Sequence, residues 1–354
     1  MHPEASNPTP SGKKSELTLL AMIRKRAERR STCGETFPSL RLGIGDDCAL
    51  LRLRPGQQLA LTTDLSIAGR HFSLDWHPPE AIGHRALVRG LSDLAAMGAR
   101  PVAAFLSLGL PRELTGNWLN RFLDGFLALA DAHQTPLAGG DLSESPLPVA
   151  DIVLTGVVRS GRELLRSGAR PGHLLYVTGS LGGAALGLAQ LEQWAAQQPR
   201  PARRTQSSFA EPRPLRIPAR LAPSLAPHLY PQPRIAQGLW LARRAAASAT
   251  IDLSDGLSTD LAHLCQASGV AAEIDAAALP IFPGATLDQA LHGGEAYELL
   301  FTAPPSARIP RRIAGIPVTR IGRILGARAD APQIRLDTAA GAQILKPGGW
   351  QHFT

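Results

Sequence analysis

The chain has 354 residues, enough for two domains, and its 44% hydrophobic and 19% charged residues are ordinary for a globular protein. Its three cysteines are far apart and form no Cys-x-x-Cys pair, which argues against a disulfide framework or a zinc site and favours a reduced, cytoplasmic setting. No run of about 18 apolar residues occurs, so we expect no membrane span.

The net charge of +8 would suit nucleic-acid binding, but much of it is local. Between Arg200 and Arg220 there are six arginines and one acid, Glu211, which together give +5. The surrounding segment, about 197–227, is rich in Pro, Arg, Ala and Ser and has neither a helical nor a strand period. We therefore expect a solvated insertion loop. An arm that contacts phosphate or RNA is the alternative, although no pattern of interleaved aromatic residues supports it.

The first half of the chain, 15–160, follows a polar tail at 1–14 that we expect to be flexible. Apolar residues at helical spacing predict its helices, and short apolar or β-branched runs predict its strands. The predicted helices span 17–30, 79–97 and 114–133, and the predicted strands span 59–64, 102–108 and 151–158. The strand at 59–64 is expected to end on an acidic turn.

A second unit, 161–354, begins near Gly161. We expect a strand at 174–178, a glycine turn at 179–183, helices at 184–197 and 234–247, a strand at 249–253, and a further helix for which Ser254 is the N-cap. Strands and helices alternate in both halves without a clear βαβ rhythm. This pattern predicts an α+β fold with helices packed on one face of mixed sheets.

Acidic residues beside small residues recur along this otherwise basic chain. The motifs are Gly45-Asp46-Asp47, Thr62-Thr63-Asp64, Ser92-Asp93, Gly139-Gly140-Asp141 and Asp252-Leu253-Ser254-Asp255-Gly256. Carboxylates held on such turns suit Mg²⁺, which takes oxygen ligands and usually bridges to substrate phosphates. If the five segments converge in space, they form the metal site of a phosphoryl-transfer enzyme.

Each motif also has a structural alternative. Gly and Asp are ordinary residues of surface turns, Asp64 could cap the turn after its strand, and Asp255 could be a favourable acid in the first turn of a helix. Asp93 lies in an apolar helical stretch, so it either points to solvent or binds a cation. Ser254 and the first free N–H groups would form an anion-binding helix start, and the first-turn alternative explains Asp255 but not Asp252.

Other signals are weaker. The glycine turn Gly179–Gly183 could cradle a phosphate, but it lacks the Lys-Ser/Thr ending of a Walker A loop. No Gly-x-Ser-x-Gly motif occurs, and the cysteines have no matching histidines, so nothing indicates a protein nucleophile. A direct, metal-assisted in-line transfer would need none.

Taken together, nine segments in order resemble the thiamine-monophosphate kinase family of the aminoimidazole-ribonucleotide-synthetase-like ATP-binding superfamily. They are GIGDDCALL (43–51), TTD-x4-GRHF (62–72), LSDLAAMGA (91–99), GGD (139–141), LLRSGARPG (164–172), HLYPQPR (228–234), IDLSDGLSTDL (251–261), GGEAYELLFT (293–302) and GWQHF (349–353). The resemblance covers about 15–353, apart from the insertion.

The resemblance implies transfer of the γ-phosphoryl group of ATP to thiamine monophosphate, with several Mg²⁺ ions. The implied metal ligands are Asp47, Thr62, Thr63, Asp64, Asp93, Asp141, Asp252 and Asp255. The implied ATP contacts are Gly140, Asp141, Arg166 and Ser254, and the implied contacts to the thiamine substrate are His71, Glu295 and Trp350. Trp350 could stack on the cationic thiazolium ring, and Glu295 offers a carboxylate. A terminal core anchor and a structural histidine are the alternatives for Trp350 and His71.

The family resemblance also implies a homodimer. Its N-terminal mixed sheets would form a shared β-barrel with helices outside, its C-terminal domain would be an α/β sandwich, and ATP would lie in the cleft between domains. Three residues depart from the family pattern: Gly90 replaces Asn, Glu144 replaces Arg, and Ala296 replaces Asp. These changes motivate one alternative, a catalytically weak homologue that binds thiamine phosphates or nucleotide without turnover. Two further alternatives are a superfamily enzyme with another acceptor and a basic RNA-binding protein that uses the 200–220 arm.

Overall fold

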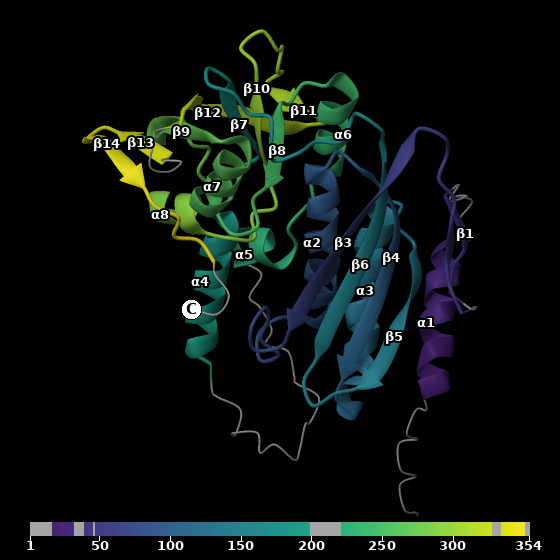
Figure 1. The fold of residues 1–354 in the computed structure, drawn as a ribbon. Helices are drawn as coiled ribbons and strands as arrows, with labels where there is room; N and C mark the ends of the chain where they lie inside the picture. Colours follow the sequence, from purple (N-terminus) through teal and green to yellow (C-terminus); the bar gives the residue numbers. More distant parts are fainter. Residues whose placement is uncertain (1–15, 32–38, 45–46, 199–220, 328–333, 351–354) are drawn as a thin grey trace, which may run out of the picture.

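The computed structural model describes residues 16–31, 39–44, 47–198, 221–327 and 334–350, which form two units of mixed α and β structure (Figure 1). The expected flexible tail at 1–14, Asp46 and most of the expected insertion lie outside the described residues. No helix in the described ranges is long and apolar enough to cross a membrane. Each unit is built around its own β-sheet.

The first unit contains a four-stranded sheet in the order β3-β6-β4-β5. Its outer strands are β3 and β5, the β4–β5 pair is parallel, and the other pairs are antiparallel. Burial alternates along β3, so successive side chains face opposite sides of the sheet. The bounds are β3 Gln57–Ile67, β4 Arg100–Leu110, β5 Leu137–Glu144 and β6 Val149–Arg159.

Two long helices cover one face of this sheet. Helix α2 (Pro79–Ala96) and helix α3 (Asn117–Ala132) supply buried apolar residues at helical spacing to a common core with β4 and β6. The short 3₁₀ turn η1 (Arg112–Leu114) precedes α3. Helix α1 (Glu16–Ser31) lies beside β5, and the β1 (Leu40–Leu42) and β2 (Leu50–Leu51) pair forms a separate small sheet.

The second unit contains an eight-stranded sheet whose main path runs β14-β13-β9-β12-β7-β10-β8, with β11 paired to β12. The β13–β9 pair is parallel and the remaining pairs are antiparallel. The bounds are β7 Leu174–Thr178, β8 Ala249–Asp252, β9 Val270–Asp275, β10 Leu299–Ala303, β11 Arg312–Ile313, β12 Ile316–Gly326, β13 Ile334–Thr338 and β14 Gly341–Leu345.

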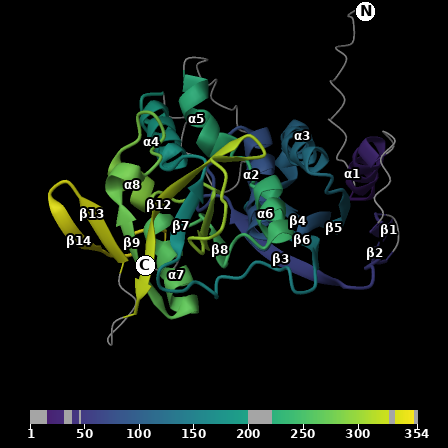
Figure 2. The same ribbon diagram turned by 90° about the horizontal axis from the view of Figure 1, so that it is seen from above.

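Helices of the second unit divide between its own core and the junction with the first unit (Figure 2). Helices α7 and α8 contribute buried leucines to the core of the eight-stranded sheet, whereas α6 packs against α2 of the first unit. The bounds are α4 Gly183–Ala196, α5 Ala222–Leu229, α6 Ile235–Arg244, α7 Leu257–Ser268, α8 Leu287–His292, and the 3₁₀ turn η3 Ala276–Ala278.

The α2–α6 junction is unusually close because glycine stands at the contact. A methyl group on Gly238 would lie 2.0 Å from the carbonyl oxygen of Ala95, too close for any side chain. Gly98, just after α2, similarly leaves no room beside Ala242. This close packing fixes α2 against the second unit, so that side chains on α2 can reach groups on β8.

Four sequence-based expectations need correction. The strand at 59–64 does not end at Asp64 but continues as β3 to Ile67, and β5 was not predicted. The end of the expected insertion loop is helical, since α5 begins at Ala222 with proline in its first turn. The N-cap of α7 is Gly256 rather than Ser254.

Candidate active site

A single cleft of about 850 Å³ lies where the two units meet. Its lining includes Asp64 from β3, Asp93 from α2, and Asp252, Ser254 and Asp255 from the end of β8 and the turn that follows. Three of the five acidic segments found in the sequence therefore converge on one cavity. The same cavity is lined by His71, Glu295 and Trp350.

Two hydroxyl groups fix the carboxylates at the floor of this cleft. Ser92 Oγ donates to Asp252 Oδ2 at 2.7 Å, which joins α2 to β8 across the two units. Thr62 Oγ1 donates to Asp93 Oδ2 in a short hydrogen bond, which joins β3 to α2. Asp93 thus does not point freely to solvent, and its burial inside an apolar helix is explained by its place in this carboxylate group.

The carboxylates repel one another in a buried setting. Burial, together with the charge of Asp93, raises the pKa of Asp64 to about 6. The same two effects raise the pKa of Asp252 to about 7, although Arg166 acts in the opposite direction. Burial also raises the pKa of Asp93. A divalent cation among the three carboxylates would remove this repulsion, and a set of carboxylate and hydroxyl oxygens fits Mg²⁺.

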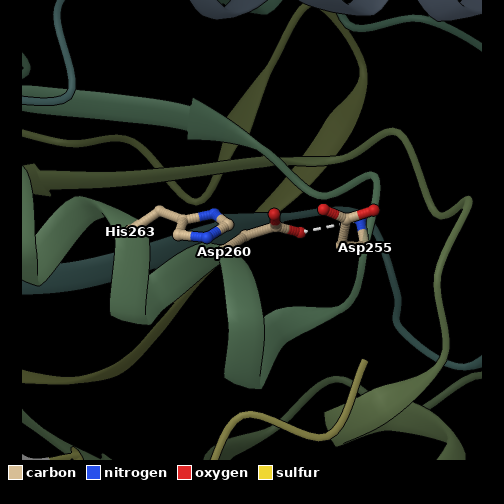
Figure 3. A group of neighbouring side chains, drawn as sticks. All are labelled: Asp255, Asp260 and His263. Atoms are coloured by element: carbon tan, nitrogen blue, oxygen red, sulfur yellow. Dashed lines mark hydrogen bonds between the residues drawn. The ribbon is translucent and has the colours of Figure 1, made fainter. Parts of the chain in front are cut away.

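A further carboxylate, Asp260 on α7, organises the turn after β8 (Figure 3). Its Oδ2 accepts the backbone N–H groups of Asp255 at 3.1 Å and Gly256 at 3.0 Å. The free N–H groups expected at this helix start are therefore already bound. Asp255, Asp260 and His263 also offer ligand atoms that all lie within 4.8 Å of one another, a set that could hold a metal ion.

The C-terminal segment places Trp350 at the rim of the cleft. The Trp350 backbone N–H donates to the Asp255 carbonyl at 3.1 Å, and the Gly349 N–H donates to Thr259 Oγ1 at 3.1 Å. A methyl group on Gly349 would lie 2.1 Å from the Asp255 carbonyl oxygen, so only glycine allows this approach. Trp350 remains 51% exposed. The backbone of Trp350 is thus tethered to the turn that carries Asp255.

Glu295 is held by a buried arginine that the sequence reading did not identify. Arg85 Nη2 lies 2.6 Å from Glu295 Oε1, and the same guanidinium donates to the carbonyl oxygens of His228 at 2.7 Å and His71 at 3.2 Å. Glu295 has a φ of +62°, a left-handed conformation that is unfavourable for a residue with a side chain. Because its charge is already paired, Glu295 is not a free carboxylate for a cationic substrate.

Two buried histidines extend the network behind Glu295. The Ser73 backbone N–H donates to His77 Nδ1 at 3.0 Å, which leaves the ring proton on Nε2. That nitrogen lies 3.0 Å from His228 Nε2, and His228 Nδ1 lies 3.5 Å from Glu295 Oε2. Burial and the nearby Arg85 charge lower the pKa of both rings, to about 3 for His77. The pair is therefore neutral at physiological pH.

Other residues singled out in the sequence lie outside this group. Asp47 is exposed and does not line the cleft, and neither does Arg166, although the charge of Arg166 acts on Asp93 and Asp252. The glycine turn at 179–183 also lies outside the lining. Within one chain, these residues are not part of the carboxylate group formed by Asp64, Asp93 and Asp252.

The register of the first sheet separates Asp141 and Thr63 from Asp64. Asp64 aligns with Ile152, Ile152 with Leu106, and Leu106 with Gly140, so Asp141 belongs to the adjacent row. Because side chains alternate along strands, Asp141 and Thr63 project from the face opposite to that of Asp64. Gly140 must be glycine, since a methyl group there would lie 1.9 Å from the Leu106 carbonyl oxygen.

The three departures from the family pattern have local explanations. Gly90 faces the sheet core, where a methyl group would lie 2.7 Å from Ile152 Cδ1. Glu144 forms an exposed ion pair with Arg112 at 2.7 Å. Ala296 packs against the core of the second unit. None of the three lines the cleft.

The spacing of the charged residues along α2 could have identified Arg85 from the sequence alone. Arg85, Arg89 and Asp93 recur every four residues in an otherwise apolar helix, which places three charged side chains on one face. Arg89 Nε lies 3.4 Å from Asp64 Oδ1 and thereby continues the charged row toward β3. No comparable spacing marks His228 or Asp260, whose roles depend on tertiary contacts.

Comparison with known proteins agrees with this geometry. Two family models match, the N-terminal domain of AIR synthase related proteins over residues 45–158 and their C-terminal domain over 170–334. The thiamine-monophosphate kinase of Salmonella typhimurium is 41% identical over 294 residues, which is 80% of this chain and 83% of that protein. The Synechococcus elongatus enzyme is 36% identical, covering 88% of this chain and 91% of its own length.

Solved structures give the same result. The crystal structure of thiamine-monophosphate kinase from Stenotrophomonas maltophilia K279a is similar with a TM-score of 0.73 and 36% identity, over 89% of this chain and 95% of that one. The structure of AaThiL complexed with AMPPCP and TMP has a TM-score of 0.71 and 28% identity, over 96% and 97% of the two chains.

Two α+β units that enclose a carboxylate-lined cleft define a two-domain protein of the AIR synthase related class. Within that class, identity of up to 41% over most of both chains settles the narrower assignment. The chain belongs to the thiamine-monophosphate kinase family.

Proposed function

We propose that this protein transfers the γ-phosphoryl group of ATP to the phosphate of thiamine monophosphate, giving thiamine diphosphate and ADP. The observation that carries the proposal is the single cleft lined both by Asp64, Asp93 and Asp252 and by Trp350 and Glu295. The carboxylates suit metal-bound phosphates, and the same cleft offers an aromatic ring and a paired carboxylate. Family membership supports the same reaction.

Magnesium ions are the proposed partners of the three buried carboxylates. Asp64, Asp93 and Asp252 would hold them, with Asp255 at the edge of the cleft. The ions would neutralise the negative charges of donor and acceptor phosphates, which otherwise repel each other. The protein itself orients the carboxylates through the Ser92 and Thr62 hydroxyl groups.

Direct transfer between the two substrates is the proposed route. The two cysteines in the described part of the chain do not line the cleft, and burial raises the pKa of the Cys265 thiol to about 12. In a direct transfer the acceptor phosphate oxygen forms the new bond to phosphorus while the bond to the ADP oxygen breaks. Arg89 and Arg85, from adjacent turns of α2, also line the cleft, where they are paired with Asp64 and Glu295.

At the acceptor end, we propose that Trp350 stacks on the thiazolium ring. Its position in the cleft lining and its backbone hydrogen bond to Asp255 support this role, and cation–π stacking contributes roughly 0.5–2 kcal/mol. His71 and Glu295 would shape the same end of the cleft, with Glu295 acting through its pairing with Arg85. Gly140, Asp141, Arg166 and Ser254 are the proposed contacts of the nucleotide.

A homodimer with a shared β-barrel is the proposed assembly. Strand β3 lies at the edge of its sheet and carries three exposed leucines on the face away from the helices: Leu59, Leu61 and Leu65. An 11-residue edge strand with an apolar face is a ready surface for association. Because Asp141 and Thr63 share that face, a partner packed there would cover them too.

We place the domain boundary between residues 160 and 161 and the protein in the cytoplasm. The two family models end at 158 and begin at 170 on either side of this boundary, which supports its position. A compartment that supplies ATP fits the proposed reaction.

The direct test is formation of thiamine diphosphate by the purified protein with ATP, Mg²⁺ and thiamine monophosphate. We expect product at a rate of the order of 1 s⁻¹ or more, and at least a hundredfold less in the presence of excess EDTA. A protein that binds both ligands but gives no product would favour the catalytically weak homologue. Glu144→Arg and Ala296→Asp would then show whether these two departures are the cause, whereas position 90 has no room for Asn beside Ile152.

A further inference from the structure

A second hollow, of about 260 Å³, lies away from the cleft and shares no lining residue with it. Four arginines from four different segments line it: Arg100 from β4, Arg159 at the end of β6, Arg162 from the connection between the units, and Arg243 from α6. No acidic residue belongs to the lining. The hollow is therefore strongly electropositive.

The sheet register explains why these charges gather. Gln57 of β3 aligns with Arg159 of β6, and Arg100 of β4 aligns with Val157 of the same strand, so three strands end together. The connection then turns, with the Arg162 N–H donating to the Arg159 carbonyl at 2.9 Å. The close packing of α6 on α2 brings Arg243 to the same place.

The four arginines differ in their partners from the buried arginines of the site and the second unit. Arg85 and Arg234 are paired with Glu295 and Glu298, whereas Arg159, Arg162 and Arg243 have no ion-pair partner in the described ranges. Arg100 donates only to neutral oxygens, those of Pro101 at 3.2 Å and Ser39 at 3.3 Å. Burial and the nearby charge of Arg54 lower the pKa of Arg100, as expected where positive charges crowd without a counter-ion.

We propose that this hollow binds a small phosphate-bearing anion of about the size of a diphosphate group. Guanidinium groups make paired hydrogen bonds to phosphate oxygens, and four of them converging without a carboxylate favour a multiply charged ligand. The volume is below the range usual for drug-sized ligands, so a diphosphate fits while a nucleoside would remain outside. Free pyrophosphate and the diphosphate end of a nucleotide share this chemistry.

The site adjoins the helix that carries the catalytic-site candidates. Gly98, which lines the hollow, follows the end of α2, and Asp93 lies one turn earlier on that helix. Arg243 lies on α6, which is fixed to α2 at Gly238. An anion that bridges Arg243 to the arginines of the first unit would therefore connect the two units on the side away from the cleft.

The test is calorimetric titration of the purified protein with pyrophosphate at low ionic strength in EDTA, without ATP, thiamine monophosphate or metal. We expect one site per chain with a Kd below about 1 mM. The Arg243→Gln variant should weaken binding at least about tenfold. Arg244→Gln is the matched control, because Arg244 lies on the same helix, loses the same charge, and stacks on Trp240 rather than lining the hollow.

A second variant guards against loss of folding. Gln57→Glu keeps the size of the side chain but adds a carboxylate inside the hollow, and it should also weaken pyrophosphate binding about tenfold. Titration with ADP distinguishes the two sources, since a nucleotide ligand should bind at least as tightly as free pyrophosphate. Equal weakening by Arg244→Gln, or unchanged binding in both hollow variants, would overturn the proposal. Neither result would bear on kinase turnover.

Discussion

At the scale of single residues, the site depends on how buried charges are partnered. Asp252 is almost fully buried, and its hydroxyl partner Ser92 cannot neutralise it. A carboxylate in this position destabilises the metal-free fold, and metal binding would offset that cost. Function and stability should therefore respond in opposite directions when the charge is removed.

Asp252→Asn tests this opposition. We expect kcat to fall at least about a hundredfold, because one proposed metal ligand loses its charge. Without metal at pH 8, the free energy of unfolding should rise by the order of 1 kcal/mol, because the buried charge at position 252 is removed. Activity assays and denaturant unfolding in EDTA measure the two effects, with Asp337→Asn, at a half-buried position of β13 outside the cleft, as the control.

The sign of the pH dependence follows from the raised pKa. Between pH 3.8, the ordinary pKa of an aspartate side chain, and about pH 7, the raised pKa of Asp252, the unfolded chain loses the Asp252 proton while the folded chain keeps it. The metal-free wild type should thus lose stability as pH rises through this window, by up to about 1.4 kcal/mol per pH unit for such a group. The Asn variant should show a shallower slope; an identical slope and normal kcat would refute the charge-cluster account.

Arg85 gives a separate prediction at the same scale. Arg85→Met should raise the KM for thiamine monophosphate about tenfold or more with a smaller effect on kcat, because Glu295 and the His71 and His228 carbonyls lose their common donor. Arg85→Lys should restore only part of the loss, since an ammonium cannot reach all three acceptors in the fork geometry.

Arg121→Met is the matched control for Arg85, because it breaks another arginine–carboxylate pair, at 2.8 Å from Glu80, outside the cleft. A lower unfolding midpoint with unchanged KM in both Arg85 variants would reduce Arg85 to a structural role.

At the scale of elements, the local sequence pattern predicted a helix or strand correctly where it agreed with the packing of the fold. The helix predicted at 79–97 is α2 almost to the residue, because Pro79 begins it and its apolar positions repeat at helical spacing. Strand β5 was missed because Gly139-Gly140-Asp141 has the composition of a turn. In the fold Gly140 lies within the strand, where the Leu106 carbonyl leaves no room for a side chain.

The turn after β8 shows a second limit. Serine is a residue type favoured at N-caps, which is why Ser254 was predicted to be one. In the fold, the carboxylate of Asp260, within the helix, already accepts the Asp255 and Gly256 N–H groups. That contact depends on the fold of the turn. Likewise, the sequence predicted that the acidic motifs converge, and three of them do. The side of the sheet from which Asp141 and Thr63 project follows from the strand register, which is determined by the pairing of distant strands.

The exposed face of strand β3 allows the proposed dimer interface to be tested. Leu61 is 60% exposed on the face that we propose to be covered, so Leu61→Asp should convert a dimer to monomers of 37.5 kDa in light-scattering measurements. Leu147→Asp is the control, because Leu147 is similarly exposed but lies outside the strands. A wild-type monomer, or a variant that remains dimeric, would rule out this surface as the interface.

At the scale of the whole molecule, the site exists only because the two units are locked together. Asp64 and Asp93 come from the first unit and Asp252 from the second, and the Ser92–Asp252 hydrogen bond crosses between them. The glycine contact of α6 on α2 holds that arrangement. The sequence could indicate two units and a shared cleft through its motifs, but not the sheet orders or the close junction, because these depend on contacts between distant segments.

The most direct measurement is an anomalous-scattering map from crystals grown with Mn²⁺, a non-hydrolysable ATP analogue and thiamine monophosphate. Mn²⁺ takes the same oxygen ligands as Mg²⁺ and can be located independently of the protein. The account predicts metal peaks about 2.1 Å from carboxylate oxygens of Asp64, Asp93 and Asp252, between the two phosphate-bearing ligands. Peaks confined to the Asp255–Asp260–His263 group, or none at the three carboxylates, would contradict it.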